Sequence, residues 1–165
     1  MIRNLLFLFL AASLVIGCHH SVDKGFFDRF DTVPINCATE VAKAKAENKL
    51  LLLEFGSSDS CAPCQRFERE VFSQPEFLDY AGSNLVFVRV DFPFYTDLSS
   101  NVLATNTCLM AQYNVGGFPT FIALNPKGDE IWRLPQTNDL DPNFERLMAP
   151  KAFISQMNTL KNNRQ

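Results

Sequence analysis

Histidine is the scarcest reactive residue in this 165-residue sequence: the only two, His19 and His20, are adjacent and near the N-terminus. The rest of the chain therefore has no imidazole to act as the base of a cysteine–histidine protease. A zinc site built on one cysteine pair needs a second pair of ligands, and the sequence offers none. We expect no metal site and no cofactor.

Positive charge is also in short supply, with 15 Lys and Arg against 18 Asp and Glu. The chain thus lacks the basic surface that binds nucleic acid. It has no internal repeat and no low-complexity tract. Its length and its 47% apolar content fit one globular domain, and 16 phenylalanines beside a single tryptophan predict a core built from Phe.

The N-terminal segment 1–17 has the pattern of a secretory signal peptide. Arg3 precedes an apolar run from Leu5 to Ile16, which is shorter than the roughly 20 residues needed to span a bilayer. Val15-Ile16-Gly17-Cys18 resembles the bacterial lipobox, which implies lipidation of Cys18 and a membrane anchor. The alternative is an ordinary signal peptide with a chance cysteine. Either way we expect export, with residues 18–35 as a tether and lead-in and 36–165 as the domain.

The order of predicted elements indicates an α/β fold. A strand at 50–55 is continuously apolar, which is typical of a strand buried on both faces. Alternating helices and strands followed by a hairpin predict a central mixed β-sheet flanked by helices on both faces. Helices are expected at 36–48, 65–72, 76–81, 101–113 and 151–160, and the other strands at 85–91, 120–124 and 131–134.

The most informative motif is Cys61-Ala62-Pro63-Cys64, which lies between that apolar strand and a helix. The first turn of a helix has unpaired N–H groups and partial positive charge, which stabilise the nucleophilic thiolate. We expect the more exposed Cys61 to attack a substrate disulfide and Cys64 to resolve the mixed disulfide. A purely structural disulfide is the alternative, but so small a loop adds little stability.

Two glutamates are candidates for moving a proton to or from Cys64. Glu54 ends the apolar strand, where burial would raise the pKa of its carboxyl. Glu68 follows Cys64 by four residues. Each could instead be a solvated carboxylate, at a strand end or on a helix surface.

From about residue 36 to residue 160 the chain resembles thioredoxin-like proteins. The resemblance rests on the strand before the dithiol, the Cys61–Cys64 motif and Gly117-Phe118-Pro119-Thr120. It implies a thioredoxin-like fold in which Pro119 is cis and lies against the dithiol, and in which the Phe118 backbone meets the substrate. It also implies that a proline before the second cysteine accompanies reducing activity. The substrate-binding residues implied are Ala62, Pro63, Phe118, Pro119 and Thr120.

Segments 56–61, 67–77 and 84–93 resemble an exported bacterial subgroup of that family. This implies a periplasmic reductase of disulfides in exported proteins, recharged by a membrane electron donor of the DsbD type. Isomerase or oxidase activity, or a non-catalytic binding module, are the alternatives. Ser60 and Gln65 replace the tryptophan and the basic residue common in thioredoxin, and Glu54 lies seven rather than six residues before Cys61.

Two further features leave alternatives open. Cys37 and Cys108 could form a disulfide, or each could be a small buried residue on its helix. The aromatic stretch from Phe92 to Tyr95 could line a substrate groove, but we favour a role in capping the core.

Overall fold

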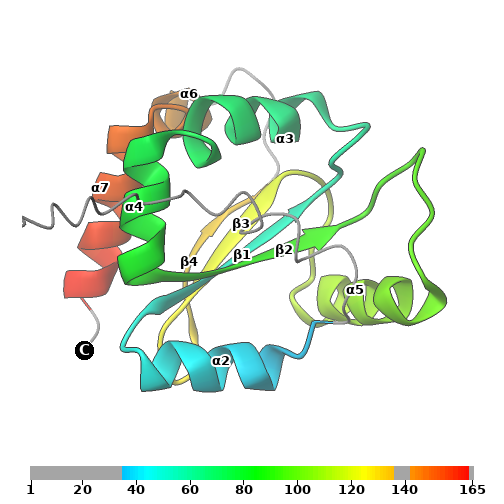
Figure 1. Ribbon diagram of the computed structural model, residues 1–165, viewed down its shortest axis with the longest axis horizontal. Coiled ribbons are helices and arrows are strands. Elements are labelled where there is room, and N and C mark those ends of the chain that lie inside the picture. Colours follow the sequence, from blue (N-terminus) through cyan, green and yellow to red (C-terminus); the bar gives the residue numbers. More distant parts are fainter. Residues whose placement is uncertain (1–34, 136–141, 164–165) are drawn as a thin grey trace, which may run out of the picture.

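A computed structural model describes residues 35–135 and 142–163, and Figure 1 shows its ribbon. The predicted signal segment, Cys18, both histidines and the tether to residue 34 lie outside the described residues. Within the described part, no helix is long and apolar enough to cross a membrane. The elements in order are α2 (Cys37–Ala46), β1 (Leu50–Gly56), α3 (Ala62–Phe67), η1 (Glu68–Phe72), α4 (Pro75–Asn84), β2 (Leu85–Asp91), α5 (Ser100–Gln112), β3 (Thr120–Leu124), β4 (Glu130–Leu134), α6 (Pro142–Leu147) and α7 (Pro150–Asn162).

The four strands form a mixed sheet in the order β2-β1-β3-β4. β2 is parallel to β1, whereas β3 is antiparallel to both β1 and β4. All seven residues of β1 are buried, as the continuous apolar run predicts. The mixed sheet of the sequence prediction is confirmed.

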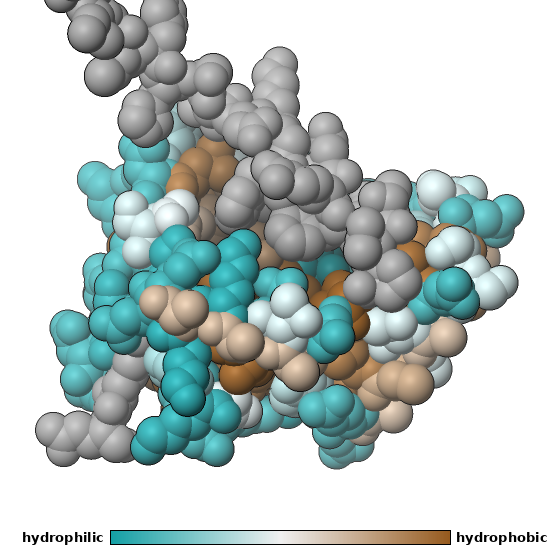
Figure 2. All heavy atoms as spheres, turned by 60° about the horizontal axis from the view of Figure 1, so that its bottom comes forward, coloured by the Kyte–Doolittle hydropathy of each residue, from teal (hydrophilic) through white to brown (hydrophobic). Residues whose placement is uncertain are grey.

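Helices cover both faces of this sheet, as Figure 1 shows. Because side chains alternate along a strand, Leu52 packs toward α3, η1, α4, α6 and α7, whereas Leu53 packs toward α2 and α5. Figure 2 shows the α2 and α5 side, where hydrophilic residues lie next to apolar ones. Both layers of helices are therefore needed to bury the sheet.

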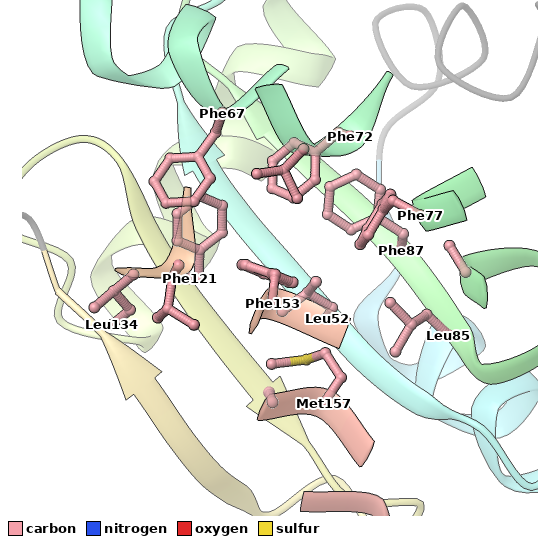
Figure 3. Packing of buried hydrophobic residues seen from close by; sticks show 14 of the residues in the cluster. Leu52, Phe67, Phe72, Phe77, Leu85, Phe87, Phe121, Leu134, Phe153 and Met157 are labelled. Atoms are coloured by element: carbon pink, nitrogen blue, oxygen red, sulfur yellow. The ribbon is translucent and has the colours of Figure 1, made fainter. Parts of the chain in front are cut away.

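Phenylalanine builds the larger of the two cores, as the composition predicts. The Phe67 ring lies 4.6 Å from that of Phe121 and 5.0 Å from that of Phe144, measured between centroids, and both pairs meet edge to face. Figure 3 shows Phe67, Phe72, Phe121 and Phe153 grouped between the sheet and the helices. Because Phe67 lies three residues after Cys64, this packing fixes the helix that carries the dithiol.

Two details differ from the sequence prediction. α2 ends at Ala46, because Asn48 takes up a left-handed conformation with φ of 52° that ends the helical path. α6 was not predicted as a separate helix, because a six-residue helix is too short to show a hydrophobic period. It exists because its Phe144 and Leu147 are buried in the larger core.

Three connections meet at one end of the sheet, where β1 and β2 finish and β3 begins. Gly56, the last residue of β1, is paired with Asp91 at the end of β2. Phe55 is paired with Thr120, the first residue of β3. The loops that follow β1 and β2 and the loop that precedes β3 therefore lie together.

Candidate active site

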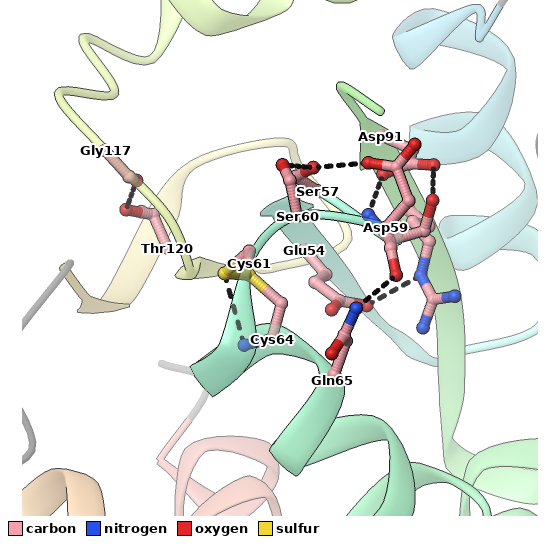
Figure 4. Close-up of a disulfide and its surroundings, with 12 residues drawn as sticks. Glu54, Ser57, Asp59, Ser60, Cys61, Cys64, Gln65, Asp91, Gly117 and Thr120 are labelled. Carbon is pink, nitrogen blue, oxygen red and sulfur yellow. Dashed lines mark hydrogen bonds and ion pairs between the residues drawn. A yellow bond between two sulfur atoms is a disulfide. The ribbon is translucent and has the colours of Figure 1, made fainter. Parts of the chain in front are cut away.

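Cys61 and Cys64 form a disulfide at the start of α3, with their Cα atoms 5.2 Å apart (Figure 4). Cys61 is the N-cap of the helix, and the Cys64 backbone N–H donates a hydrogen bond to its Sγ over 3.2 Å. Cys61 is half-buried, whereas Cys64 is only 5% exposed. The helix N-terminus therefore offers a polarised N–H to the Cys61 sulfur, which is the more accessible of the two.

The Phe118–Pro119 peptide bond is cis, which confirms the expectation drawn from the family resemblance. Pro119 itself is buried. Thr120 donates a hydrogen bond from its Oγ1 to the Gly117 carbonyl over 2.8 Å, which holds the loop in a tight turn (Figure 4). Because Thr120 is paired with Phe55, the cis-proline loop lies at the same end of the sheet as the dithiol.

Glu54 is a buried carboxyl next to the inner cysteine. Glu54 is only 2% exposed. A methyl group placed on Gly56 would lie 3.3 Å from the Cys64 Sγ and 3.7 Å from a Glu54 carboxyl oxygen, so sulfur and carboxyl are both near that point. Burial raises the pKa of Glu54 to about 7, although the nearby Arg89 guanidinium opposes the rise. A carboxyl with this pKa can exchange a proton near neutral pH.

Arg89 joins the two candidate glutamates, and it is not among the site residues predicted from the sequence. Its Nε donates to Glu54 over 3.1 Å, and its second guanidinium nitrogen contacts the Glu68 carboxylate. Burial opposes the charge of Arg89, but the two carboxylates outweigh it and raise the pKa of the guanidinium. The signal was present: β2 is an apolar strand interrupted by one arginine, which lies directly opposite Glu54.

A cavity of about 310 Å³ lies beside the disulfide. Polar residues form much of its wall, and a cavity of this size and polarity can hold water. The Glu68 side chain is 31% exposed, whereas that of Glu54 is 3% exposed, so Glu68 is the one closer to solvent. The wall includes Glu54, Cys64, Gln65, Glu68, Arg89 and Asp91.

Asp59 organises the loop before the dithiol, a role that the sequence did not reveal. Its carboxylate accepts hydrogen bonds from the backbone N–H groups of Phe94 and Tyr95, each over 2.7 Å. Ser57 donates to the same carboxylate and also shares a 2.6 Å hydrogen bond with Ser60. The loop carrying Cys61 is thereby connected to the loop that follows β2.

The expectation that the aromatic stretch caps the core is wrong for two of its residues. Phe94 is 77% exposed and Tyr95 is 78% exposed. The physical reason is the connection to Asp59, which holds this backbone outside the sheet. Phe92 is half-buried and stacks on Phe118, with ring centroids 5.3 Å apart.

Cys37 and Cys108 do not form the disulfide that was left open, because both are free thiols. Cys37 is half-buried on α2, where burial raises the pKa of its thiol. Cys108 is exposed on α5, so its interpretation as a small buried residue is wrong.

Comparison with known proteins gives a family match and similar proteins. Residues 37–139, more than half of the chain, match the family described as a thioredoxin-like domain. The disulfide bond reductase DsbH of Chlamydia pneumoniae is 31% identical over 97 residues, which is 59% of this chain and 58% of that protein. The thiol:disulfide interchange protein DsbD 2 of Pseudomonas aeruginosa is 31% identical over 111 residues, or 66% of this chain and 17% of that protein. The matched region is therefore less than two thirds of each of these relatives.

A solved structure of a DsbH oxidoreductase superposes on this chain with a TM-score of 0.65 at 25% identity. The superposition covers 81% of this chain and 87% of that one. A thioredoxin from Thermus thermophilus superposes with a TM-score of 0.51 at 21% identity, covering 74% and 82% of the two chains. The predicted fold is thus confirmed by structure as well as by sequence.

Proposed function

Because this chain belongs to the thioredoxin-like family, we propose that it is a periplasmic thiol–disulfide oxidoreductase that reduces disulfides in exported proteins. The observation that carries the proposal is the Cys61–Cys64 pair, whose outer sulfur caps a helix while its inner sulfur lies beside a buried carboxyl. The reducing direction is supported by the printed name of the DsbH relative, a disulfide bond reductase. Export is supported by the signal-like segment 1–17 and the lipobox-like residues before Cys18.

The first step begins from the reduced enzyme. The Cys61 thiolate attacks one sulfur of the substrate disulfide, so that a Cys61–substrate bond forms, the substrate S–S bond breaks and one substrate thiolate leaves. The N–H that Cys64 donates to the Cys61 sulfur stabilises the attacking thiolate. The Phe118 backbone, the buried Pro119 and Thr120 hold the substrate strand beside the dithiol, together with Ala62 and Pro63.

The second step releases the product. Cys64 loses its proton and attacks the Cys61 sulfur, which forms the Cys61–Cys64 disulfide and frees the second substrate thiolate. Two electrons have then passed from enzyme to substrate, and both substrate thiolates take up protons. A dithiol donor of the DsbD type returns the two electrons, and the similarity to DsbD 2 supports this choice.

Glu54 is the group that accepts the Cys64 proton. Its carboxyl and the Cys64 sulfur are both near the position of a Gly56 Cβ and both residues line the same cavity, and its pKa of about 7 allows it to bind and release a proton at the pH of the periplasm. Glu68 acts on Glu54 through the shared Arg89 and connects it with the open part of the cavity.

The equilibrium potential of the Cys61–Cys64 pair against glutathione tests the direction of the reaction. A reductase is expected to have a potential near that of thioredoxin, about −270 mV. A value near that of the oxidant DsbA, about −120 mV, would contradict the reductase proposal and favour the oxidase alternative.

Replacing Glu54 with glutamine is expected to remove a pH-dependent loss of stability from the oxidised protein. Burial holds the pKa of Glu54 at about 7 in the folded protein, against 4.5 for the ordinary group. The folded protein therefore keeps a proton that the unfolded chain loses as the pH rises, and wild-type stability falls between pH 4.5 and 7 and stays reduced above. This difference in pKa corresponds to about 3 kcal/mol, so the stability of Glu54→Gln relative to wild type should rise by about 1–3 kcal/mol from pH 4.5 to pH 8, on top of a pH-independent cost of separating Arg89 from Glu54.

Urea unfolding at pH 4.5 and pH 8 measures this effect. The difference between the two proteins should move in favour of Glu54→Gln as the pH rises from 4.5, where the folded Glu54 is protonated and the unfolded one is only half ionised. Glu76→Gln is the matched control, since Glu76 is an exposed glutamate on α4. A difference between wild type and Glu54→Gln that stays constant over this pH range would contradict the burial argument.

A further inference from the structure

An exposed aromatic pair lies outside the machinery described so far. Among residues 35–135 and 142–163, Phe94 and Tyr95 are the most exposed large apolar side chains, at 77% and 78%. Their rings meet edge to face with centroids 5.0 Å apart. Neighbouring aromatic rings kept in water are unfavourable for a free monomer and are typical of surfaces that bind a partner.

The loop that carries this pair is fixed rather than loose. The Asp59 carboxylate accepts hydrogen bonds from the backbone of both Phe94 and Tyr95. Burial opposes ionisation of this carboxyl, but these hydrogen bonds outweigh it and lower the pKa of Asp59. The anchor is therefore an ionised carboxylate, and charge-assisted hydrogen bonds of this kind hold a loop well.

The same anchor ties the pair to the attacking cysteine. Asp59 lies two residues before Cys61, and Ser57 connects its carboxylate with Ser60, the residue directly before Cys61. Figure 1 shows the loop between β2 and α5 reaching beyond the sheet, toward the segment that leads into α3. At its base, Phe92 stacks on Phe118 of the cis-proline loop. The aromatic pair thus continues the surface on which a substrate disulfide must lie.

We propose that Phe94 and Tyr95 form a docking surface for apolar side chains that flank the disulfide of a protein substrate. This inference rests on the proposed function. Asp59 holds the backbone of both rings against segment 57–60, which leads directly into Cys61, so side chains next to a disulfide that reaches Cys61 can meet the rings. The Asp59 carboxylate is already occupied by backbone N–H groups. The surface therefore presents aromatic rings, rather than a charged group, to the substrate. It therefore selects disulfides that are flanked by apolar side chains.

Two disulfide-bonded peptides of equal length, with Leu and Val or with Ser and Asn beside the cysteines, test this docking surface. The wild-type enzyme should reduce the apolar peptide with a kcat/KM about tenfold higher. The Phe94→Ala/Tyr95→Ala variant should lose this preference through a higher KM. Tenfold corresponds to about 1.4 kcal/mol, less than the burial of one aromatic ring yields. Oxidised glutathione is too small to contact Cys61 and the two rings at once. Its reduction should therefore change less than about twofold in the same variant.

Control variants separate docking from a loss of fold. Leu103→Ala removes another exposed apolar side chain, on α5, and should keep the preference. Asp59→Asn weakens the anchor and should reduce the preference while the rings remain. A double variant that still prefers the apolar peptide, or a wild type that reduces both peptides equally, would overturn the docking surface and leave the proposed function intact. A wild type that reduces neither peptide nor glutathione would overturn the proposed function itself.

Discussion

The Cys61→Ser variant is expected to lose disulfide reduction, with a fall in kcat/KM of at least about 1,000-fold. Serine cannot form the covalent bond to a substrate sulfur, and the remaining thiol of this helix, that of Cys64, is only 5% exposed. Cys64→Ser should behave differently. Its Cys61 can still attack, but the mixed disulfide has no resolving thiol and should accumulate.

Insulin reduction followed by turbidity measures the loss, and mass spectrometry without reductant detects the accumulated adduct. Cys108→Ser is the matched control, because it removes an exposed thiol on α5 and should keep full activity. An adduct that forms on Cys64 in the Cys61→Ser variant would reverse the assigned order of attack. Equal inactivity of the wild type and both variants with every reductant would favour the non-catalytic binding module.

The second large effect is expected for Arg89→Met, which should destabilise the protein by about 3–5 kcal/mol at pH 8. The Arg89 guanidinium donates to the buried Glu54 and contacts Glu68. Methionine fills a similar volume but leaves the Glu54 carboxyl without a cationic partner. A loss of this size lowers Tm by about 10 °C in a protein of this length.

The double variant Glu54→Gln/Arg89→Met shows whether charge is the cause. Removing both members of a buried ion pair costs much less than removing one. The double variant should therefore recover most of the lost stability, and the single variant should lose less at pH 5, where Glu54 is protonated. Thermal unfolding at both pH values checks this. Equal destabilisation of the single and double variants would mean that Arg89 acts through packing alone.

The strands and the dithiol helix were predictable because their signals are local. β2 and β3 have the bounds that the apolar runs indicate, Leu85–Asp91 and Thr120–Leu124. The dithiol was visible because both cysteines lie within one turn of the same helix. Pro119 could be placed beside it only through the family resemblance, because a cis peptide bond has no local signature of its own.

The contacts that pass between loops could not be predicted in the same way. Asp59 reads as an ordinary turn residue until the structure brings Phe94 and Tyr95 to its carboxylate, 35 and 36 residues further along the chain. The exposure of those two rings follows from that contact, which the sequence does not show, and the sequence therefore favoured a role in capping the core. Arg89 is an intermediate case, because its position in an apolar strand was visible but its partner depended on the register of β1 and β2.

The lack of a side chain at Gly56 limits which residues can occupy this position in related sequences. The large apolar residues of β1 can be exchanged for others of similar volume at modest cost. At Gly56 even a methyl group would lie 3.3 Å from the Cys64 sulfur, so that sulfur would have to shift by a few tenths of an ångström, while the 3.7 Å distance to a Glu54 oxygen leaves no room for anything larger than a methyl group on that side. A related sequence that retains both cysteines and the glutamate but has a bulky residue here would therefore carry the same reactive groups without their present neighbourhood. In a survey of such sequences, this glycine is as informative as the cysteines themselves.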